Sequence, residues 1–407
     1  MLKVLKFGGT SVGDLEKIQN VANIIKKEKD KNYDLVVVVS AMSGVTNKLS
    51  SYAKHFSKDS NSKEIDMLLS AGERISSALL ALALNEQGYA SISMSGREAG
   101  ILTDCHYTRA KIQSIDTKNI SKALEGGRII IVAGFQGYTE EGRVSTLGRG
   151  GSDLSAVALA GALSANICEI YTDVDGIYTS DPRIEPRARK LQKISYEEML
   201  ELSSLGAKVL QTRSVEMAKK FDVNIVSRSS FSPEIEGTLI TKEGNIMEKA
   251  LVSGIALDKN QVRIGLYGVS DKPGIAALIF SDLAKSQVNV DMIVQTVAVN
   301  GKTSLDFTVP TEDLEKTKNI MLRFKKDIQK VDYNEEICKL SVVGLGMKTN
   351  SGVASKAFET LAKENINIRI ISTSEIKISM IIEEKYAELG VRALHEAYHL
   401  DKTCKSS

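Results

Sequence analysis

Short apolar runs alternate with amphipathic segments over about the first 230 residues of the chain. The runs at 4–7, 35–40 and 128–135 have strand length and lack alternating polar positions. Such runs are typical of strands buried on both faces, so the alternation predicts an α/β fold with a mostly parallel sheet sandwiched by helices. Helical periodicity is found in residues 14–30, 74–88, 153–165, 190–206 and 209–222, and further strands are expected within 169–179 and 224–230.

The pattern changes after residue 250, where one sequence motif occurs twice. Residues 268–293 and 346–371 align at a constant offset of 78 residues. Each copy reads as a strand, a glycine turn, a helix and a second strand, so a duplicated module is expected. The matched pairs are Gly268 and Gly346, Gly274 and Gly352, Phe280 and Phe358, Leu283 and Leu361, Ala284 and Ala362, and Asn289 and Asn367.

Each copy is expected to continue into a small βαββαβ module. In the first copy, Asn300–Gly301 predicts a type I′ hairpin. Thr311, followed by Glu312 and Asp313, predicts the amino-terminal cap of the next helix. The second copy continues with a strand at 377–384 and a helix that ends near residue 400.

Composition narrows the function classes. A chain of 407 residues is too long to fold around one compact core, so two or three domains are expected. Its formal net charge of +2 gives no sign of a nucleic-acid or anionic-membrane partner. No apolar signal region precedes the first glycines, and the scattered cysteines form no CxxC pair, so a cytoplasmic protein with reduced thiols is expected. His395 and His399 form an i,i+4 pair, which is interpreted as an exposed helix face because two histidines alone are too few for a zinc site.

The first candidate site is the stretch KFGGTS, residues 6–11, directly behind the first strand. Its glycines would let the backbone approach phosphate oxygens, the next helix start would add free N–H groups, and Lys6 would neutralise a phosphoryl group. The lysine precedes the glycines, so the stretch is not a P-loop. Taken alone, it is equally consistent with a tight turn beside a surface lysine.

Three further loops contain the same kinds of residue. The small, hydroxyl-bearing residues 40–47 suit an anion-binding loop or a helix cap. In the stretch 146–153, Arg149 stands between glycines, where its guanidinium can meet a carboxylate in a bidentate fork, and Asp153 can orient Lys6. The polar stretch 172–183 suits a nucleotide loop or a surface turn. Together the four loops indicate a phosphoryl-transfer site that uses no covalent nucleophile.

At these motifs the chain resembles the aspartate kinases of the amino-acid kinase family over essentially its whole length. KFGGTSV, SGVTN, GFQG, TLGRGGSD, TDVDGIYTSDPR and GAKVLQTRSVE appear in the order of that family. The resemblance implies an amino-acid-kinase-like catalytic domain at 1–245 and two ferredoxin-like ACT modules at 246–336 and 337–407. Residues 246–262 belong to the first module or contribute to the second.

The resemblance implies transfer of the γ-phosphoryl group of Mg-ATP to the β-carboxylate of L-aspartate. The product is 4-phospho-L-aspartate, and the reaction is the first step of lysine, threonine and methionine biosynthesis. The acceptor carboxylate is already ionised at pH 7, so no general base is expected. Two alternatives stay open: an amino-acid kinase with another substrate, such as glutamate, and a non-catalytic amino-acid sensor.

The matching positions imply roles for individual residues. Lys6 and Asp153 are the expected catalytic pair, and the protein is expected to need Mg²⁺ with ATP but no metal site of its own. Glu73 is expected to face the α-ammonium of aspartate and Arg149 a carboxylate. The substrate set is Thr46, Glu73, Phe135, Arg149 and Ser152, and the ATP set is Lys6, Gly8, Gly9, Ser40, Thr172, Asp173, Tyr178, Arg183 and Lys208.

The resemblance also implies regulation. Feedback inhibition by lysine, threonine or both is expected at the ACT modules, in a homo-oligomer (dimer or tetramer), with an internal start at Met247 as a source of a separate regulatory subunit. Gln211–Thr212 stands where some members carry His-Pro, which leaves Lys208 in place and favours the form without a homoserine dehydrogenase. The expected effector contacts are Asp271, Gly274, Ala276, Asn289, Gln295, Asn367, Ile368, Ser374 and Glu375.

Overall fold

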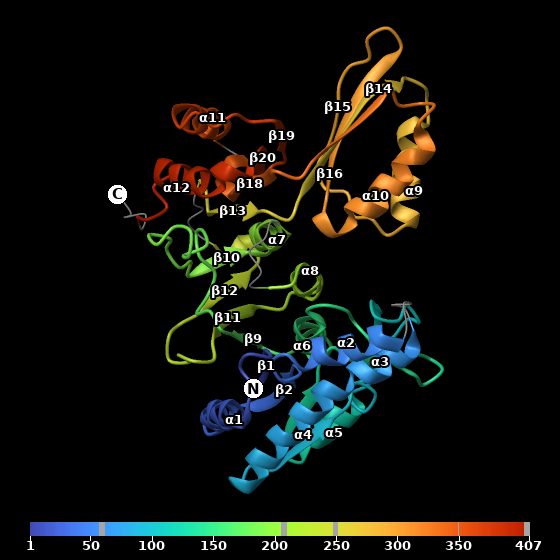
Figure 1. Ribbon diagram of the computed structural model, residues 1–407. Coiled ribbons are helices and arrows are strands. Elements are labelled where there is room, and N and C mark those ends of the chain that lie inside the picture. Colours follow the sequence, from blue (N-terminus) through green and yellow to red (C-terminus); the bar gives the residue numbers. More distant parts are fainter. Residues whose placement is uncertain (57–61, 205–209, 247–250, 349, 403–407) are drawn as a thin grey trace. The chain divides into compact units, whose positions relative to one another are not determined.

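The computed structural model describes residues 1–56, 62–204, 210–246, 251–348 and 350–402, which form two compact units (Figure 1). Most of the chain up to residue 247 makes up the first unit. The segment Tyr178–Arg189 is an exception, because it packs within the second unit together with the residues after 247. The chain therefore leaves the first unit directly after Ile177 and returns to it at Lys190.

The first unit is built on an eight-stranded sheet with the order β10-β12-β11-β9-β1-β2-β6-β3. Every neighbouring pair is parallel except β11 and β12, which confirms the mostly parallel sheet. The strands are β1 (Leu2–Phe7), β2 (Asp34–Val39), β3 (Ser91–Met94), β6 (Ile129–Ala133), β9 (Ile167–Thr172), β10 (Lys193–Ser195), β11 (Ile225–Ser229) and β12 (Thr238–Thr241).

Helices cover both faces of this sheet. On one face, Leu5 and Phe7 of β1 pack in a core with apolar residues of α1 (Leu15–Lys29) and α4 (Ala71–Glu86). Successive side chains of a strand point to opposite faces, so Lys6 points to the other face. That face is covered by α6 (Gly151–Ala162), which packs against α8 (Thr212–Phe221). The alternation of β1 thus directs Lys6 toward α6.

A smaller sheet in the first unit, of order β5-β4-β7-β8, has no counterpart in the sequence prediction. Its strands have only three or four residues each, which is too short to produce a recognisable period. They are β4 (Ile101–Thr103), β5 (Ile112–Ile115), β7 (Gln136–Tyr138) and β8 (Val144–Thr146), and the remaining helices of this unit are α2 (Val45–Phe56), α3 (Lys63–Leu69), α5 (Lys118–Glu125) and α7 (Tyr196–Ser204).

The prediction of one helix over 190–206 was wrong at its beginning. β10 occupies Lys193–Ser195, and α7 starts only at Tyr196. Ser195 and Glu198 form a capping box, in which the Ser195 hydroxyl accepts a hydrogen bond from the Glu198 N–H at 3.1 Å and the Glu198 carboxylate accepts one from the Ser195 N–H at 3.2 Å. Such a box begins a helix, so the residues before it remain free to join the sheet.

One helical stretch among the described residues, Lys63–Glu86, is long and apolar enough to cross a membrane by length and composition alone. Half of its most apolar window is buried inside the protein. Leu80 and Leu84 of this stretch are fully buried in the core beneath the sheet. Their burial is that of a helix packed in the protein core.

The first module of the second unit is a four-stranded antiparallel sheet of order β15-β16-β14-β17. Asn300 and Gly301 have φ angles of 53° and 69°, as the predicted type I′ hairpin requires. The predicted cap at Thr311 is wrong, because Thr311–Asp313 forms a 3₁₀ turn and no side-chain cap bond precedes α10. The elements are β14 (Val262–Ser270), α9 (Ile275–Lys285), β15 (Ile293–Gln295), β16 (Lys302–Val309), α10 (Leu314–Met321) and β17 (Lys330–Asn334).

The second module has the same arrangement with a different source for one strand. Its sheet order is β13-β18-β20-β19, and β13 (Gly254–Asp258) pairs antiparallel with β18 in the place that β17 takes in the first module. The order βαββαβ within this copy is therefore wrong, since its fourth strand comes from ahead of both modules. The other elements are β18 (Ile337–Val343), α11 (Val353–Lys363), β19 (Ile370–Thr373), β20 (Lys377–Glu383) and α12 (Ala387–Ala397).

Candidate active site

A buried ion pair lies between the end of β1 and the first turn of α6. The Nζ atom of Lys6 is 2.5 Å from Oδ1 of Asp153. Lys6 is 7% exposed and Asp153 is 8% exposed, so water screens neither charge well. Removing either partner would leave an uncompensated charge, and the pair therefore holds the ammonium group in one place.

The loop that follows β1 approaches the neighbouring loop closely. A Cβ atom added at Gly9 would lie 2.9 Å from the carbonyl oxygen of Ala41, and one added at Gly8 would lie 3.5 Å from Nζ of Lys6. The stretch is thus a turn in which at least Gly9 cannot carry a side chain without a shift of the backbone. Backbone without side chains therefore lies beside the lysine, and the Gly8 N–H itself donates to the Tyr171 carbonyl at 3.2 Å.

The expected free helix start lies elsewhere in the site. α1 begins six residues beyond Gly9, and the Asp14 side chain caps it by accepting a hydrogen bond from the Lys17 N–H at 2.9 Å. α6, in contrast, has Gly150 with φ of 71° as its N-cap and no side-chain cap bond. The positive end of a helix dipole beside Lys6 and Asp153 is therefore that of α6, not α1.

Glu73 lies in the first turn of α4 and is almost fully buried, with 3% of it exposed. Its Oε1 atom accepts a hydrogen bond from the Ala41 N–H at 3.1 Å, and its Oε2 atom has no hydrogen-bond partner among the described residues. Burial raises the pKa of Glu73 to about 7. A buried carboxylate with one satisfied oxygen can accept a cation at the other.

The loop after β2 is held close to α4. Ser40 accepts a hydrogen bond at its carbonyl from the Ser76 hydroxyl at 2.7 Å, and a Cβ atom at Gly72 would lie 2.7 Å from that of Ala41. Thr46 follows in the first turn of α2. Ser40 therefore lies on a loop that Glu73 and its helix fix in position, and Thr46 lies in the helix that follows this loop.

Phe135 has a strained backbone. Its φ angle is 67°, a region that bulky side chains rarely adopt. Its N–H donates to the Ser155 hydroxyl at 3.1 Å, and a Cβ atom at the preceding Gly134 would lie 2.9 Å from the Ser152 hydroxyl. The end of β6 is thus fitted tightly against the start of α6, where Ser152 is 6% exposed.

Arg149 projects from the turn just before α6. Gly148 and Gly150 on either side have φ angles of 82° and 71°, and Arg149 itself is exposed. Its guanidinium has no ion-pair partner among the residues that the structure describes. A free guanidinium on the approach to a buried Lys–Asp pair is suited to an anionic ligand.

Two of the residues expected at ATP belong to a different unit from the other described ones. Thr172 and Asp173 lie at the end of β9 in the first unit, whereas Tyr178 and Arg183 belong to the second unit. Arg183 there pairs with Asp181 at 2.7 Å. Lys208 lies outside the described residues.

Sequence reasoning missed Ser230. Its hydroxyl is 2.8 Å from that of Ser11, and its N–H donates to the Thr172 carbonyl at 3.0 Å. It thereby links the loops that follow β1, β9 and β11. Adjacent serines of this kind carry no periodic signal, and only the parallel order of the three strands brings them together.

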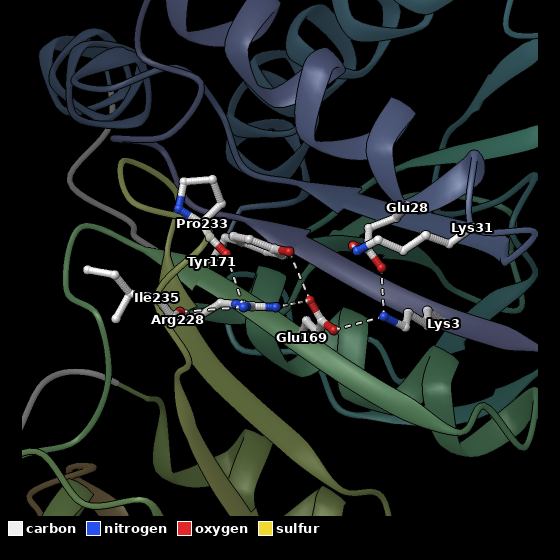
Figure 2. Close-up of polar contacts among 8 residues, drawn as sticks. All are labelled: Lys3, Glu28, Lys31, Glu169, Tyr171, Arg228, Pro233 and Ile235. Carbon is white, nitrogen blue, oxygen red and sulfur yellow. Dashed lines mark hydrogen bonds and ion pairs between the residues drawn. The ribbon is translucent and has the colours of Figure 1, made fainter.

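A buried charge network includes Lys3 of β1 (Figure 2). The strand alternation directs Lys3, like Leu5 and Phe7, to the face opposite that of Lys6. Glu169 of β9 accepts hydrogen bonds from Lys3 at 3.2 Å, from the Tyr171 hydroxyl at 2.8 Å and from Arg228 at 3.2 Å. The same Lys3 pairs with Glu28 of α1 at 2.6 Å, and these contacts raise the pKa of Lys3 despite its burial. The network stiffens the three strands β1, β9 and β11 behind the site.

Of the residues expected to bind effectors, Asn289 and Asn367 occupy equivalent places in the two modules, at the offset of 78 residues. Gly274 and Gly352 have φ angles of 95° and 90° and begin the first helix of each module. Most of the other positions are exposed. Asp271 and Ala276 lie at the start of α9, Asn289 before β15 and Gln295 at its end, Asn367 and Ile368 before β19, and Ser374 and Glu375 between β19 and β20.

The interpretation of the histidine pair as an exposed face is wrong for His395. His395 is fully buried, and its Nε2 atom is 3.0 Å from the Thr179 hydroxyl within the second unit. Burial lowers its pKa, so the ring is neutral at pH 7. No group of three or more His, Cys, Asp or Glu that could hold a metal ion occurs in the part of the chain that the structure describes.

Comparison with known proteins agrees with this fold. The model of the amino acid kinase family matches residues 1–227, and the ACT domain model matches residues 264–321 and 340–398. The chain belongs to the amino acid kinase family and carries two ACT domains.

Its relatives narrow the assignment within that family. The chain is 57% identical to the aspartokinase of Helicobacter pylori (strain ATCC 700392 / 26695), over 99% of this chain and 100% of the relative. It is 47% identical to aspartokinase 2 of Bacillus subtilis (strain 168), over 98% of both chains. The structure of Escherichia coli aspartokinase III with aspartate and ADP superposes with a TM-score of 0.80 at 27% identity, covering 98% of this chain and 99% of that one. Within the amino acid kinase family, the chain is thus one of the aspartokinases.

Proposed function

We propose that this chain, as an ATP-dependent aspartate kinase, uses the Lys6–Asp153 pair and Glu73 to phosphorylate the β-carboxylate of L-aspartate. The observation that carries the assignment of these residues is the orphaned carboxylate oxygen of Glu73 on the same sheet edge as a fixed, buried lysine. A substrate with one ammonium group and two carboxylates would satisfy both this oxygen and Arg149. The product would be 4-phospho-L-aspartate.

Lys6 would stabilise the negative charge that develops on the transferring phosphoryl group. Asp153 keeps the ammonium group in place, and the uncapped start of α6 adds a further positive potential. An acceptor carboxylate is ionised at pH 7, so the reaction requires orientation of the two substrates rather than removal of a proton.

The residues present fit the phosphates of ATP, which supplies the phosphoryl group. The close approach of Gly9 to Ala41 leaves a backbone surface without side chains beside Lys6. Gly8, Gly9 and Lys6 would hold the phosphates, with Ser40, Thr172 and Asp173 of the same unit around the nucleotide. Mg²⁺ in such sites is typically held by substrate phosphates with one or two carboxylates, so it would enter with ATP.

Aspartate would be held at both of its ends. Glu73 would accept the α-ammonium, and Arg149 would bind a carboxylate in a bidentate fork. Thr46, Ser152 and Phe135 complete the pocket, since Ser152 and Phe135 lie beside the Lys6–Asp153 pair at the start of α6.

The reaction is tested with purified protein, Mg-ATP and single amino acids, with hydroxylamine to trap an acyl phosphate. We expect aspartyl hydroxamate with aspartate and at most a small amount of product with glutamate, because the longer side chain would misplace its carboxylate. Absence of aspartyl hydroxamate would refute the proposal. A product with glutamate alone would favour a glutamate-type kinase, and binding of amino acids without any turnover would favour a sensor.

We also propose that the two ACT modules bind lysine, threonine or both and lower the activity. In support, E. coli aspartokinase III has been solved in complex with lysine and aspartate in a T-state, and it superposes with a TM-score of 0.77 at 27% identity.

The domain limits would be 1–245, 246–336 and 337–407, with β13 shared with the last domain. The protein would be a cytoplasmic homo-oligomer, with an internal start at Met247, outside the described residues, giving a regulatory subunit.

Substitutions at the equivalent asparagines of the two modules separate regulation from catalysis. Asn289→Ala or Asn367→Ala is expected to raise the half-inhibitory concentration of an effector about fivefold, the loss of about one hydrogen bond, with kcat unchanged in its absence. Activity and melting temperature are measured with lysine and threonine, singly and together, since a bound effector raises the melting temperature. If neither amino acid changes either quantity, the proposed regulation is wrong.

A further inference from the structure

The turn that carries Arg149 is held in place by three side chains to which the proposed mechanism gives no role. The turn comprises residues 146–150, from the last residue of β8 to the residue before α6. Asp66, Arg213 and Gln211 each bond to a different point of its backbone. All three come from distant parts of the chain, within the first unit.

Asp66 of α3 holds the beginning of the turn. It is fully buried, and it accepts hydrogen bonds from the Thr146 N–H and the Thr146 hydroxyl, both at 2.7 Å. It also accepts from the Thr108 N–H at 2.9 Å, where Thr108 has a strained φ of 65°. Burial raises the pKa of Asp66, while these donors favour its charged form.

Arg213 and Gln211, at the start of α8, hold the middle and the end of the turn. Arg213 donates from one nitrogen to the Leu147 carbonyl at 2.6 Å and from the other to the Ala110 carbonyl at 3.0 Å. Gln211 donates from Nε2 to the Arg149 carbonyl at 2.5 Å. Its side chain also fills the space beside Gly150, where an added Cβ atom would lie 2.9 Å from Cδ of Gln211.

These contacts fix a stretch that would otherwise be mobile. Glycine samples many backbone conformations, and Gly148 and Gly150 flank Arg149 on both sides. With the backbone bonded at residues 146, 147 and 149, only the Arg149 side chain remains free to meet a ligand. A receptor group that is ordered before binding loses less entropy when its ligand arrives.

We propose that Asp66, Arg213 and Gln211 are positioning residues that orient Arg149 for the carboxylate of the amino-acid substrate. The inference rests on the proposed role of Arg149. It also gives a function to Gln211, at which the chain departs from the His-Pro of some members of the family it resembles. Where those members carry His-Pro, neither residue has a side-chain amide like that of Gln211.

Gln211→Ala in the full chain is the main test. We expect KM for aspartate to rise about fivefold, with KM for ATP unchanged and kcat within about twofold, because one hydrogen bond to the turn is lost. Arg213→Lys should give the same selective rise, since an ammonium group cannot bond to two carbonyls in a fork. Gln113→Ala, at an exposed position of β5, is the matched control and should change neither KM.

Arg149→Ala and the double variant Arg149→Ala with Gln211→Ala show whether Gln211 acts through Arg149. We expect the Gln211 effect to vanish when Arg149 is already absent. The inference is overturned if Gln211→Ala changes nothing, raises both KM values equally, or has its full effect without Arg149. If Arg149→Ala itself leaves KM for aspartate unchanged, then the proposed role of Arg149 is what fails, and the inference falls with it.

Discussion

Replacing Lys6 by methionine is expected to lower kcat about a thousandfold while KM for aspartate changes little. Methionine has a similar length but no charge, so the developing charge on the phosphoryl group would lose its nearest cation. Asp153 would also be left buried without its 2.5 Å partner. Steady-state kinetics with coupled ADP detection measure both constants.

The control for this variant is Lys31→Met. Lys31 is also an ion-paired lysine of the first unit, but its side chain is 61% exposed and it pairs with Glu28 on the opposite face of the sheet. We expect its kcat to match that of the unmodified chain. A Lys6→Met protein that is folded and turns over at the normal rate would show that Lys6 is not the catalytic lysine.

Glu73→Gln is expected to raise KM for aspartate about a hundredfold, with kcat and KM for ATP much less affected. The neutral amide would lose the charge that attracts the α-ammonium while keeping the shape of the side chain. In the unmodified chain, protonation of Glu73 competes with the substrate. KM for aspartate should therefore rise as the pH falls below about 7, the pKa of Glu73, and this dependence should disappear in the variant.

The same substitution should stabilise the free protein at alkaline pH. The pKa of Glu73 is about 7 in the folded chain and 4.5 in an unfolded reference, so the folded state binds more protons between these values and loses stability as the pH rises from about 4.5 to about 7. Glutamine carries no such cost. The free energy of unfolding of the variant, relative to the unmodified chain, should therefore increase by roughly 3 kcal/mol between pH 4 and pH 8.

Glu86→Gln is the matched control, because Glu86 lies at the exposed end of the same helix. Denaturant titrations at both pH values are expected to show no change for this variant. An unchanged KM for aspartate in a folded Glu73→Gln protein would assign the substrate ammonium to another residue. A pH-independent difference in stability would mean that Glu73 is not destabilised by its burial.

Local pattern was enough to predict much of the catalytic unit. Continuous β-branched runs separated by amphipathic helices require a parallel sheet, and parallel strands bring the loops at their carboxyl ends to one edge. For the same reason KFGGTS and residues 172–173 could be expected near each other. The period of two along β1 directs Lys6 to the face opposite Leu5 and Phe7, although the sequence could not say that α6 and Asp153 would lie there.

Contacts between distant parts of the chain decided the rest. A carboxylate in a first helical turn is usually solvated, and only the packing of α4 against Ala41 buries Glu73 and raises its pKa to about 7. The left-handed backbone of Phe135 and the three bonds to the turn of Arg149 have no local signal, since Asp66 acts on a residue 80 positions away.

In the two modules, too, the sequence predicted the elements and the tertiary structure decided how they pair. The repeat at an offset of 78 residues predicted two similar folds, because each copy encodes its own strands, glycine turn and helix. The tertiary structure decided which strand completes the second sheet. β13 precedes both copies and pairs with β18 through backbone hydrogen bonds, and these do not depend on which side chains the strand has. The sequence by itself therefore determined the elements, the repeat and the residues of the loops. Only the tertiary structure determined which of them are buried, charged and held in contact, because these properties depend on neighbours that are remote in the chain.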